Sequence, residues 1–290
     1  ICNHQAHLDL MCIMMLTSKL IILTNDWVWN SPFYGRLIRY ADFYPISNGI
    51  ENALDQLQDA VSRGYSVVIF PEGTRSDDCS IRRFRRGAFF LAEKLKLDII
   101  PVMIHGVGHV LPKQEFMLRK GYIDIQVMGR ITPDDVRFSM DYSPRSREVR
   151  RFYQERFNEL SKRLETPDYN SDLVIHNYIY KGPAIERTVR NQLRKHHNFK
   201  EMIDQLPDVG TVIVNNCGLG ALTLLISLVK KQLQVIGVEK NTDLRDLAAN
   251  CASVPANLSY IQDESVLENQ TEGMHLRIEV NDSGVKLTGI

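Results

Sequence analysis

The chain lacks several features that mark particular classes of protein. Its 290 residues carry 35 Lys and Arg and 35 Asp and Glu, so the formal net charge is zero. Without an overall positive field, nucleic-acid binding is not expected, and any anion site has to be local. No stretch reaches the roughly 18 consecutive apolar residues of a membrane-spanning helix. The five cysteines are odd in number and lack metal-ligand spacing, which favours reduced thiols in a cytosolic compartment.

The two ends of the chain favour the interpretation that it is a piece of a longer protein. It opens on Ile-Cys-Asn-His, inside an apolar strand pattern, with neither an initiator Met nor a signal-peptide pattern. It closes on Leu-Thr-Gly-Ile, which does not read as a finished terminus. We therefore expect truncation at both ends.

Short apolar runs alternate with helical patterns along the chain, which predicts an α/β fold. In the first half, residues 65–70 and 98–104 have the composition of buried strands, and residues 87–97 between them have apolar residues at helical spacing. Residues 122–128 alternate as a half-buried strand does, and residues 144–164 show the charged amphipathic pattern of a helix.

A polar segment over residues 166–172 separates the two halves of the chain. Its Thr, Pro, Asp, Asn and Ser residues are frequent in turns and linkers. We therefore predict one domain over residues 1–165 and a second over residues 173–290.

His4 and Asp9 are the first pair of residues with catalytic potential. Four residues separate them where a short strand gives way to a helix, and a turn there can fold the carboxylate back onto the imidazole. The carboxylate would fix one tautomer and leave the other ring nitrogen to accept a proton from an alcohol, whose own pKa is too high for unaided attack. The alternative is a helix-capping Asp near an ordinary surface His.

Residues 70–76, Phe-Pro-Glu-Gly-Thr-Arg-Ser, directly follow a predicted strand. Gly73 frees the backbone to approach a ligand, and Thr74 and Arg75 offer a hydroxyl and a planar cationic group. This combination suits a phosphate. The alternative is a strand-ending turn that carries a solvated Arg.

Together these motifs resemble those of the glycerolipid acyltransferase family, whose best-known members acylate lysophosphatidic acid. The family's motifs read Asn-His-x-x-x-x-Asp, then Phe-Pro-Glu-Gly-Thr-Arg-Ser, then Phe-(Lys/Arg)-x-Gly, then an apolar strand with Pro-Val. The matches, in this order, are Asn3 with His4 and Asp9, residues 70–76, residues 84–87 and residues 100–102.

The resemblance covers residues 1–165 and implies an acyltransferase with a glycerol-phosphate acyltransferase-like α/β domain. It would transfer a fatty acyl chain from acyl-CoA or acyl-carrier protein to the hydroxyl of a lysophospholipid or related lipid alcohol, without a metal or bound cofactor. His4 would be the general base and Asp9 would orient it. Its partners would be the donor, the lipid acceptor and the inner face of the cell membrane, where it would be peripheral. The acceptor would be bound by Glu72, Gly73, Thr74 and Arg75, with Arg75 at its phosphate.

One departure from the family concerns the acceptor. A further family motif places a basic residue after a strand, where it helps to bind the acceptor phosphate. Ser47 falls near that position here, and Arg36 and Arg39 lie upstream on a predicted helix. Either Arg36 and Arg39 contribute to acceptor binding, or the acceptor is another alcohol, such as a lipid-linked or aryl-tailed one.

Other candidates have two interpretations each. His105 and His109 are spaced like metal ligands, but without a third partner we interpret them as loop histidines. Cys2 is expected in the core and not as a nucleophile. A local basic cluster is either a solvated loop or a surface for substrate phosphate, an acidic carrier protein or anionic lipid. Its members are Arg82, Arg83, Arg85 and Arg86.

The second half resembles the nucleotide-binding part of class I methyltransferases, which use S-adenosylmethionine. Gly218 and Gly220 match part of the glycine-rich turn, and Glu239 matches the acid that holds the ribose. Asn216 replaces the first glycine and Val214 the acid of the first strand. The resemblance implies a partial Rossmann-like domain, which either binds S-adenosylmethionine or is a degenerate domain kept for packing or partner binding.

Three functions therefore stay open on the sequence. The leading one is a lipid-type O-acyltransferase. The second is a methyltransferase with an inactive acyltransferase partner, against which the intact motifs of the first half argue. The third is a non-catalytic module of a larger lipid-export assembly.

Overall fold

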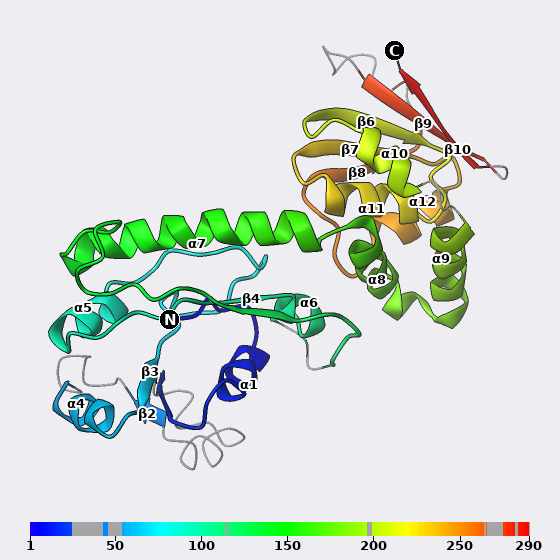
Figure 1. Cartoon of the computed structure of the whole chain (residues 1–290). Helices are drawn as coiled ribbons and strands as arrows, with labels where there is room; N and C mark the ends of the chain where they lie inside the picture. The colour runs from blue at the N-terminus through cyan, green and yellow to red at the C-terminus, as the bar shows by residue number, and fades with distance from the viewer. Residues whose placement is uncertain are drawn as a thin grey trace. The chain divides into compact units, whose positions relative to one another are not determined.

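The computed structural model describes residues 1–24, 43–45, 54–113, 115, 117–195, 199–263, 265, 275–281 and 284–289. The chain divides into two compact units, Ile1–Ser161 and Lys162–Ile290. Figure 1 colours the first unit from blue to green and the second from green to red.

The first unit is a mixed α/β structure. Strand β1 lies between β2 and β3, and all three are parallel, whereas β4 and β5 pair antiparallel. The predicted strands over 65–70, 98–104 and 122–128 are present but shorter. The described elements are α1 (Leu8–Met14), β1 (Leu20–Thr24), β2 (Phe43–Pro45), α4 (Leu54–Ser62), β3 (Ser66–Val68), α5 (Gly87–Lys94), β4 (Val102–His105), α6 (Val107–Val110), β5 (Asp124–Val127) and α7 (Tyr142–Leu164).

The first residues of the chain lie between two segments that are distant in sequence. The N–H of Cys2 donates to Ile69 O (3.1 Å), and Cys2 forms a parallel bridge with Val102. The amide of Asn3 donates from Nδ2 to Ile104 O and accepts at Oδ1 from Ile104 N, both at 2.8 Å. These bonds fix the chain just before His4, at the edge where the strands end.

Helix α7, the long green helix in Figure 1, covers this part of the first unit. Its inner stripe at helical spacing, Val149, Tyr153, Phe157 and Leu160, is buried. The hydroxyl of Tyr153 donates to Ile1 O (2.8 Å) and to Val102 O (3.3 Å). The helix therefore holds the N-terminal segment and β4 together.

The second unit is built around a five-stranded sheet with the order β10-β9-β6-β7-β8. The pairs β9–β6, β6–β7 and β7–β8 are parallel and β10 is antiparallel to β9. The β6–α11–β7 arrangement expected from the sequence is present, while its relation to Rossmann-like methyltransferase domains stays a prediction. The described elements are α8 (Pro167–Asn177), a 3₁₀ turn (Ile179–Lys181), α9 (Pro183–Lys195), α10 (Phe199–Gln205), β6 (Gly210–Asn215), α11 (Ala221–Val229), β7 (Leu233–Val238), α12 (Thr242–Ala249), β8 (Leu258–Ile261), β9 (His275–Asn281) and β10 (Gly284–Gly289).

The segment over residues 166–172 is not the turn-rich linker that its composition predicted. Thr166 caps helix α8 by accepting from Tyr169 N, and Pro167 occupies the first helical position. Thr, Pro and Asp at the start of such a segment are also helix-initiation signals, because the cap satisfies an open N–H and Pro has none to satisfy. The same residue types therefore begin a helix here.

Candidate active site

His4 and Asp9 lie in direct contact. Nδ1 of His4 is 2.8 Å from Oδ2 of Asp9, and the Asp9 side chain is fully buried at the start of α1. The same Oδ2 accepts from the backbone N–H groups of Gln5 (2.6 Å) and Ala6 (2.9 Å). A carboxylate so held accepts the Nδ1 proton and fixes the tautomer, which leaves Nε2 of His4 with a free lone pair.

The imidazole of His4 is reachable from solvent. It stacks on Phe70 with ring centroids 4.3 Å apart, and 22% of its side-chain surface is exposed. Phe70 begins the second motif, so the stacking joins the two predicted motifs in space. The ring is held on one side by Asp9 and on one face by Phe70, and the remainder is available to a substrate.

Glu72 is buried next to this pair and contacts the backbone of His4. Its side chain is 4% exposed; Oε1 accepts from His4 N and Oε2 accepts from Arg82 N, each at 3.0 Å. Burial raises the pKa of Glu72 to about 7, against the opposing effect of the two backbone hydrogen bonds. Each carboxylate oxygen thus accepts one backbone N–H, and the acceptor-binding role expected for Glu72 stays a prediction.

The rest of the second motif forms a turn beside His4. Gly73 has φ +70° and its N–H donates to Phe70 O (3.0 Å), a conformation that favours glycine. Thr74 is exposed, and Ser76 N donates to His4 O (2.8 Å). Nη1 of Arg75 donates to Lys113 O (3.0 Å), so part of its guanidinium holds another loop.

Arg85 belongs to both the Phe-Arg-x-Gly element and the basic cluster that the sequence shows, and the structure adds its contacts. Its N–H donates to Pro71 O (2.7 Å), and its side chain lies against Gly73. A Cβ placed on Gly73 would stand 2.6 Å from Nε of Arg85 and 2.8 Å from its Cζ. Neither its place in that element nor its place in the cluster predicted its contact with Gly73.

The remaining candidates of the first half differ in their placement. Arg36, Arg39 and Ser47 lie outside the described residues. Cys2 is buried, as expected, and burial raises the pKa of its thiol well above the usual value. In the part of the chain that the structure describes, no group of three or more His, Cys, Asp or Glu residues could hold a metal ion.

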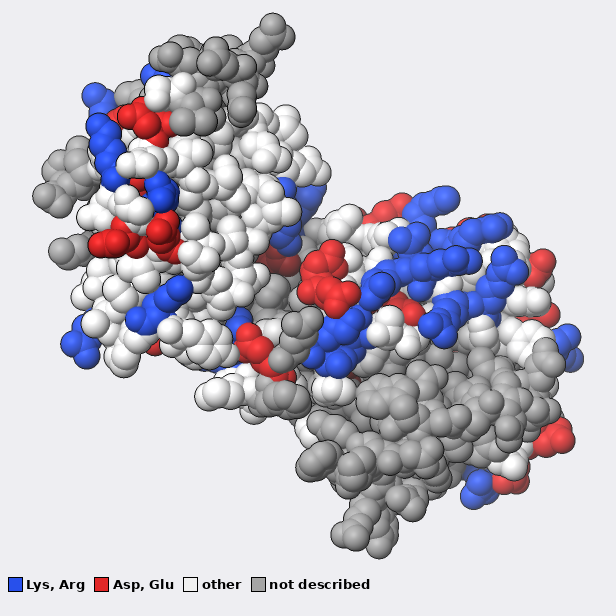
Figure 2. Space-filling model, turned by 180° about the vertical axis from the view of Figure 1, so that it is seen from behind, with Lys and Arg blue, Asp and Glu red and all other residues white. Residues whose placement is uncertain are grey.

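Basic side chains gather on the first unit. Nε of Arg150 on α7 donates to Arg82 O (3.0 Å), so the arginine cluster at 82–86 and α7 share a face. Figure 2 shows Lys and Arg side chains in a broad band over this unit. Over the described ranges, no helix combines the length and the apolar character needed to cross a bilayer.

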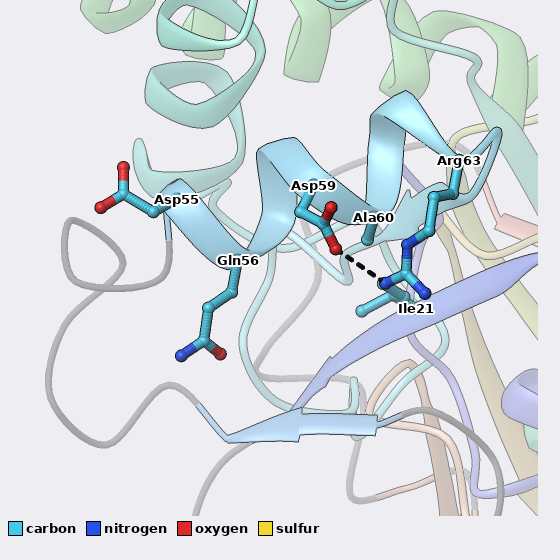
Figure 3. Close-up of a pocket in the computed structure, with 6 residues that line it drawn as sticks. All are labelled: Ile21, Asp55, Gln56, Asp59, Ala60 and Arg63. Atoms are coloured by element: carbon cyan, nitrogen blue, oxygen red, sulfur yellow. Dashed lines mark ion pairs between the residues drawn. The ribbon is translucent and has the colours of Figure 1, made fainter.

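A surface hollow of 460 Å³ lies beside α4 and β1 (Figure 3). An ion pair between Arg63 and Asp59 (3.1 Å) closes one side of it. It contains none of the motif residues, and its charged side chains are exposed. It is therefore not part of the candidate active site. Its lining residues are Ile21, Asp55, Gln56, Asp59, Ala60 and Arg63.

In the second unit, the structure brings Gly218 and Glu239 together. Oε2 of Glu239 accepts from Gly218 N (2.7 Å), and Oε1 accepts from Asn241 N (2.9 Å). Asn216 takes a left-handed conformation (φ +53°), which Asn tolerates. Gly220 packs where a Cβ would collide with Tyr260 and lie 2.9 Å from Ala248 Cβ, so this glycine serves the packing of β8 and α12.

The His–Asp pair and the adjoining motif lie in a segment that matches a known family of enzymes. Residues 1–105 match the sequence model of the family described as Acyltransferase. That match spans the first motif, the second motif and the strand that carries Pro101 and Val102.

Individual proteins that are similar to this chain carry more specific names than the family model does. A 1-acyl-sn-glycerol-3-phosphate acyltransferase of Chlamydomonas reinhardtii is 29% identical over 46% of this chain and 42% of its own length. One of Cocos nucifera is 30% identical over 47% of this chain and 46% of its own length. The crystal structure of the 1-acyl-sn-glycerophosphate acyltransferase PlsC from Thermotoga maritima matches with a TM-score of 0.48 and 22% identity, over 55% of this chain and 64% of that one. The chain thus spans about half the length of the curated relatives, and none of these matches supports a methyltransferase-like C-terminal domain.

Proposed function

We propose that the first unit transfers a fatty acyl group from an acyl thioester, acyl-CoA or acyl-carrier protein, to the hydroxyl of a lysophospholipid or related lipid alcohol. The observation that carries this proposal is the 2.8 Å contact between His4 Nδ1 and the buried Oδ2 of Asp9 beside the glycine turn at Gly73. The names of the relatives point to a 1-acylglycerol-3-phosphate type of acceptor.

In the proposed reaction, Nε2 of His4 takes the proton of the acceptor hydroxyl as its oxygen attacks the thioester carbonyl. The carbon–sulfur bond then breaks, the thiolate leaves and the proton on Nε2 passes to it, which restores neutral His4. Asp9 stabilises the imidazolium that exists between these steps. General base catalysis of this kind contributes about 10²–10⁴-fold to the rate.

The position of Asp9 makes His4 suited to this role. The carboxylate is anchored by two backbone N–H groups of its own turn, so it cannot swing away when the ring becomes charged. An alcohol needs its proton removed as it attacks, and a fixed base with one exposed nitrogen can accept that proton.

The experiment is acyl transfer by the full chain from labelled acyl-CoA and acyl-carrier protein to lysophosphatidic acid and other lipid alcohols. His4→Ala should abolish transfer while circular dichroism shows an unchanged fold, because the lost ring is partly exposed and not part of the core. Transfer that survives in His4→Ala would refute the mechanism. A folded wild-type chain that transfers to no acceptor would favour the non-catalytic module.

We also propose that this unit works on a membrane surface as a peripheral protein, at a cytoplasmic face. Helix α1, which carries Asp9, and the two residues after it expose apolar side chains. The side chains with their exposed fractions are Met11 (54%), Met14 (42%), Met15 (82%) and Leu16 (44%). Such a patch suits an acceptor that stays partly in the lipid phase.

The second candidate function concerns S-adenosylmethionine in the second unit. The contact between Glu239 and Gly218 favours it, because it places a carboxylate beside a glycine turn at the carboxyl ends of parallel strands. Calorimetric titration of the full chain with S-adenosylmethionine tests it, with Glu239→Ala as the variant expected to lose binding. Absence of heat with the wild type would leave the unit with a packing or partner-binding role.

A further inference from the structure

The cationic side chains around the glycine turn differ in how far they are already engaged. Arg75 donates to Lys113 O, and Arg82 donates to Arg75 O (3.3 Å) and pairs with Asp77 (3.4 Å). Lys113 pairs with Asp77 as well (2.7 Å). These three side chains hold one another and the loops around them.

Arg85 is different. Its side chain is exposed and, among the residues that the structure describes, it donates no hydrogen bond and forms no ion pair. Its guanidinium lies on the Cα of Gly73, as the 2.6 Å and 2.8 Å separations of the missing Cβ show. It is therefore a positioned cation whose hydrogen-bonding groups are open to a ligand.

Gly73 makes this position possible. Any other residue would place a Cβ inside the space of the Arg85 side chain, and the φ of +70° would strain it as well. The glycine of the motif thus serves two purposes here: it shapes the turn and leaves room for a guanidinium above the turn.

The segment that carries Arg85 is hydrogen-bonded to the glycine turn whose Phe70 stacks on His4. Gly73 N donates to Phe70 O, Phe70 stacks on the His4 ring, and Arg85 N donates to Pro71 O. The segments that carry the guanidinium and the base thus both contact the same short turn. A substrate whose anionic group binds Arg85 would be fixed relative to the nitrogen that takes its proton.

We propose that Arg85 binds a phosphate group of a substrate and so sets which substrate the site prefers. A guanidinium donates parallel N–H bonds to two phosphate oxygens, and this geometry gives both affinity and orientation. The role deepens the proposed acyl transfer and rests on it. The phosphate has two sources, the acceptor lipid and the CoA of the donor.

The test compares Arg85→Gln, which removes the charge and keeps most of the length, with wild type in four reactions of the full chain. The acceptor is lysophosphatidic acid or the matching monoacylglycerol, and the donor is acyl-CoA or acyl-pantetheine. Arg151→Gln is the control, because Arg151 is an exposed arginine of α7 that lies outside the site.

The expected result is a rise in KM of roughly 10–100-fold for the phosphate-bearing substrate, with little change for its phosphate-free counterpart. Loss confined to lysophosphatidic acid assigns Arg85 to the acceptor, and loss confined to acyl-CoA assigns it to the donor. Arg85→Lys should recover only part of the affinity, because an ammonium lacks the paired donors. An equal loss in all four reactions, or no loss in any, overturns the proposal.

Binding measurements separate this proposal from the proposed activity. Titration of the full chain with a short-chain lysophosphatidic acid and with a non-reactive CoA thioether needs no turnover. Weaker binding of one of them to Arg85→Gln supports the phosphate site even if wild type shows no acyl transfer. Unchanged binding of both refutes it even if acyl transfer is found.

Discussion

The buried carboxylate of Glu72 accepts the backbone N–H of His4 at 3.0 Å and, through its other oxygen, the N–H of Arg82. One side chain thus ties the strand exit that carries the base to the loop that carries the arginine cluster. Because Glu72 contacts the backbone of His4, it fixes the position of that backbone, whereas Asp9 contacts the imidazole.

Glu72 should make stability depend on pH. Burial raises its pKa from 4.5 to about 7, so between these values the folded chain binds more protons here than the unfolded chain does. The stabilising contribution of this site is fully present below about pH 4.5 and falls as pH rises towards 7, by up to roughly 3 kcal/mol.

The side chain of the Glu72→Gln variant cannot ionise, so the free energy of unfolding should depend less on pH in this variant. Its amide accepts one N–H but turns a donor towards the other, so it should be less stable than wild type at low pH and approach it above pH 7. Urea unfolding of the full chain followed by far-UV circular dichroism at a series of pH values measures this. Parallel pH profiles for the two proteins would contradict the expectation.

Asp9→Asn should lower kcat by roughly 10²–10⁴-fold with a smaller effect on KM. An amide can turn its NH₂ towards Nδ1 of His4 and stabilise the tautomer that places the proton on Nε2, where the lone pair is needed. Steady-state kinetics of the full chain measures this. Asp9→Asn with wild-type kcat would exclude the carboxylate as the group that orients His4.

The sequence predicted the local part of the site well and the distant contacts poorly. His4 and Asp9 are five positions apart, so a turn was enough to foresee the geometry that the structure shows. The partners of Glu72 come from residues ten and more positions away, and no spacing rule brings Arg85 onto Gly73. The segment 166–172 was misread because Thr, Pro and Asp begin helices and turns alike.

The pairing of Asn3 with Ile104 is a contact of the same long-range kind, and it should matter for stability. Asn3 is 1% exposed and satisfies both the N–H and the C=O of a buried strand residue. Asn3→Ala leaves both groups buried without their partner, which should cost about 2–4 kcal/mol. Asn250→Ala, which removes an exposed side-chain bond to Asp246 O, is the control and should cost less than about 1 kcal/mol. Equal urea midpoints for Asn3→Ala and wild type would contradict the role of this pair.

The apolar surface of α1 gives the last prediction. If Met11 and Met15 enter the lipid, the double variant Met11→Ser/Met15→Ser should bind lipid vesicles at least roughly tenfold more weakly, because each buried Met side chain contributes about 1.5 kcal/mol or more. Val136→Ser removes a side chain that is 97% exposed elsewhere in the same unit and should bind like wild type. Flotation with neutral and anionic vesicles measures both. Equal flotation of the double variant and wild type would place membrane binding elsewhere, whereas a loss seen equally in Val136→Ser would show that the effect is not specific to α1.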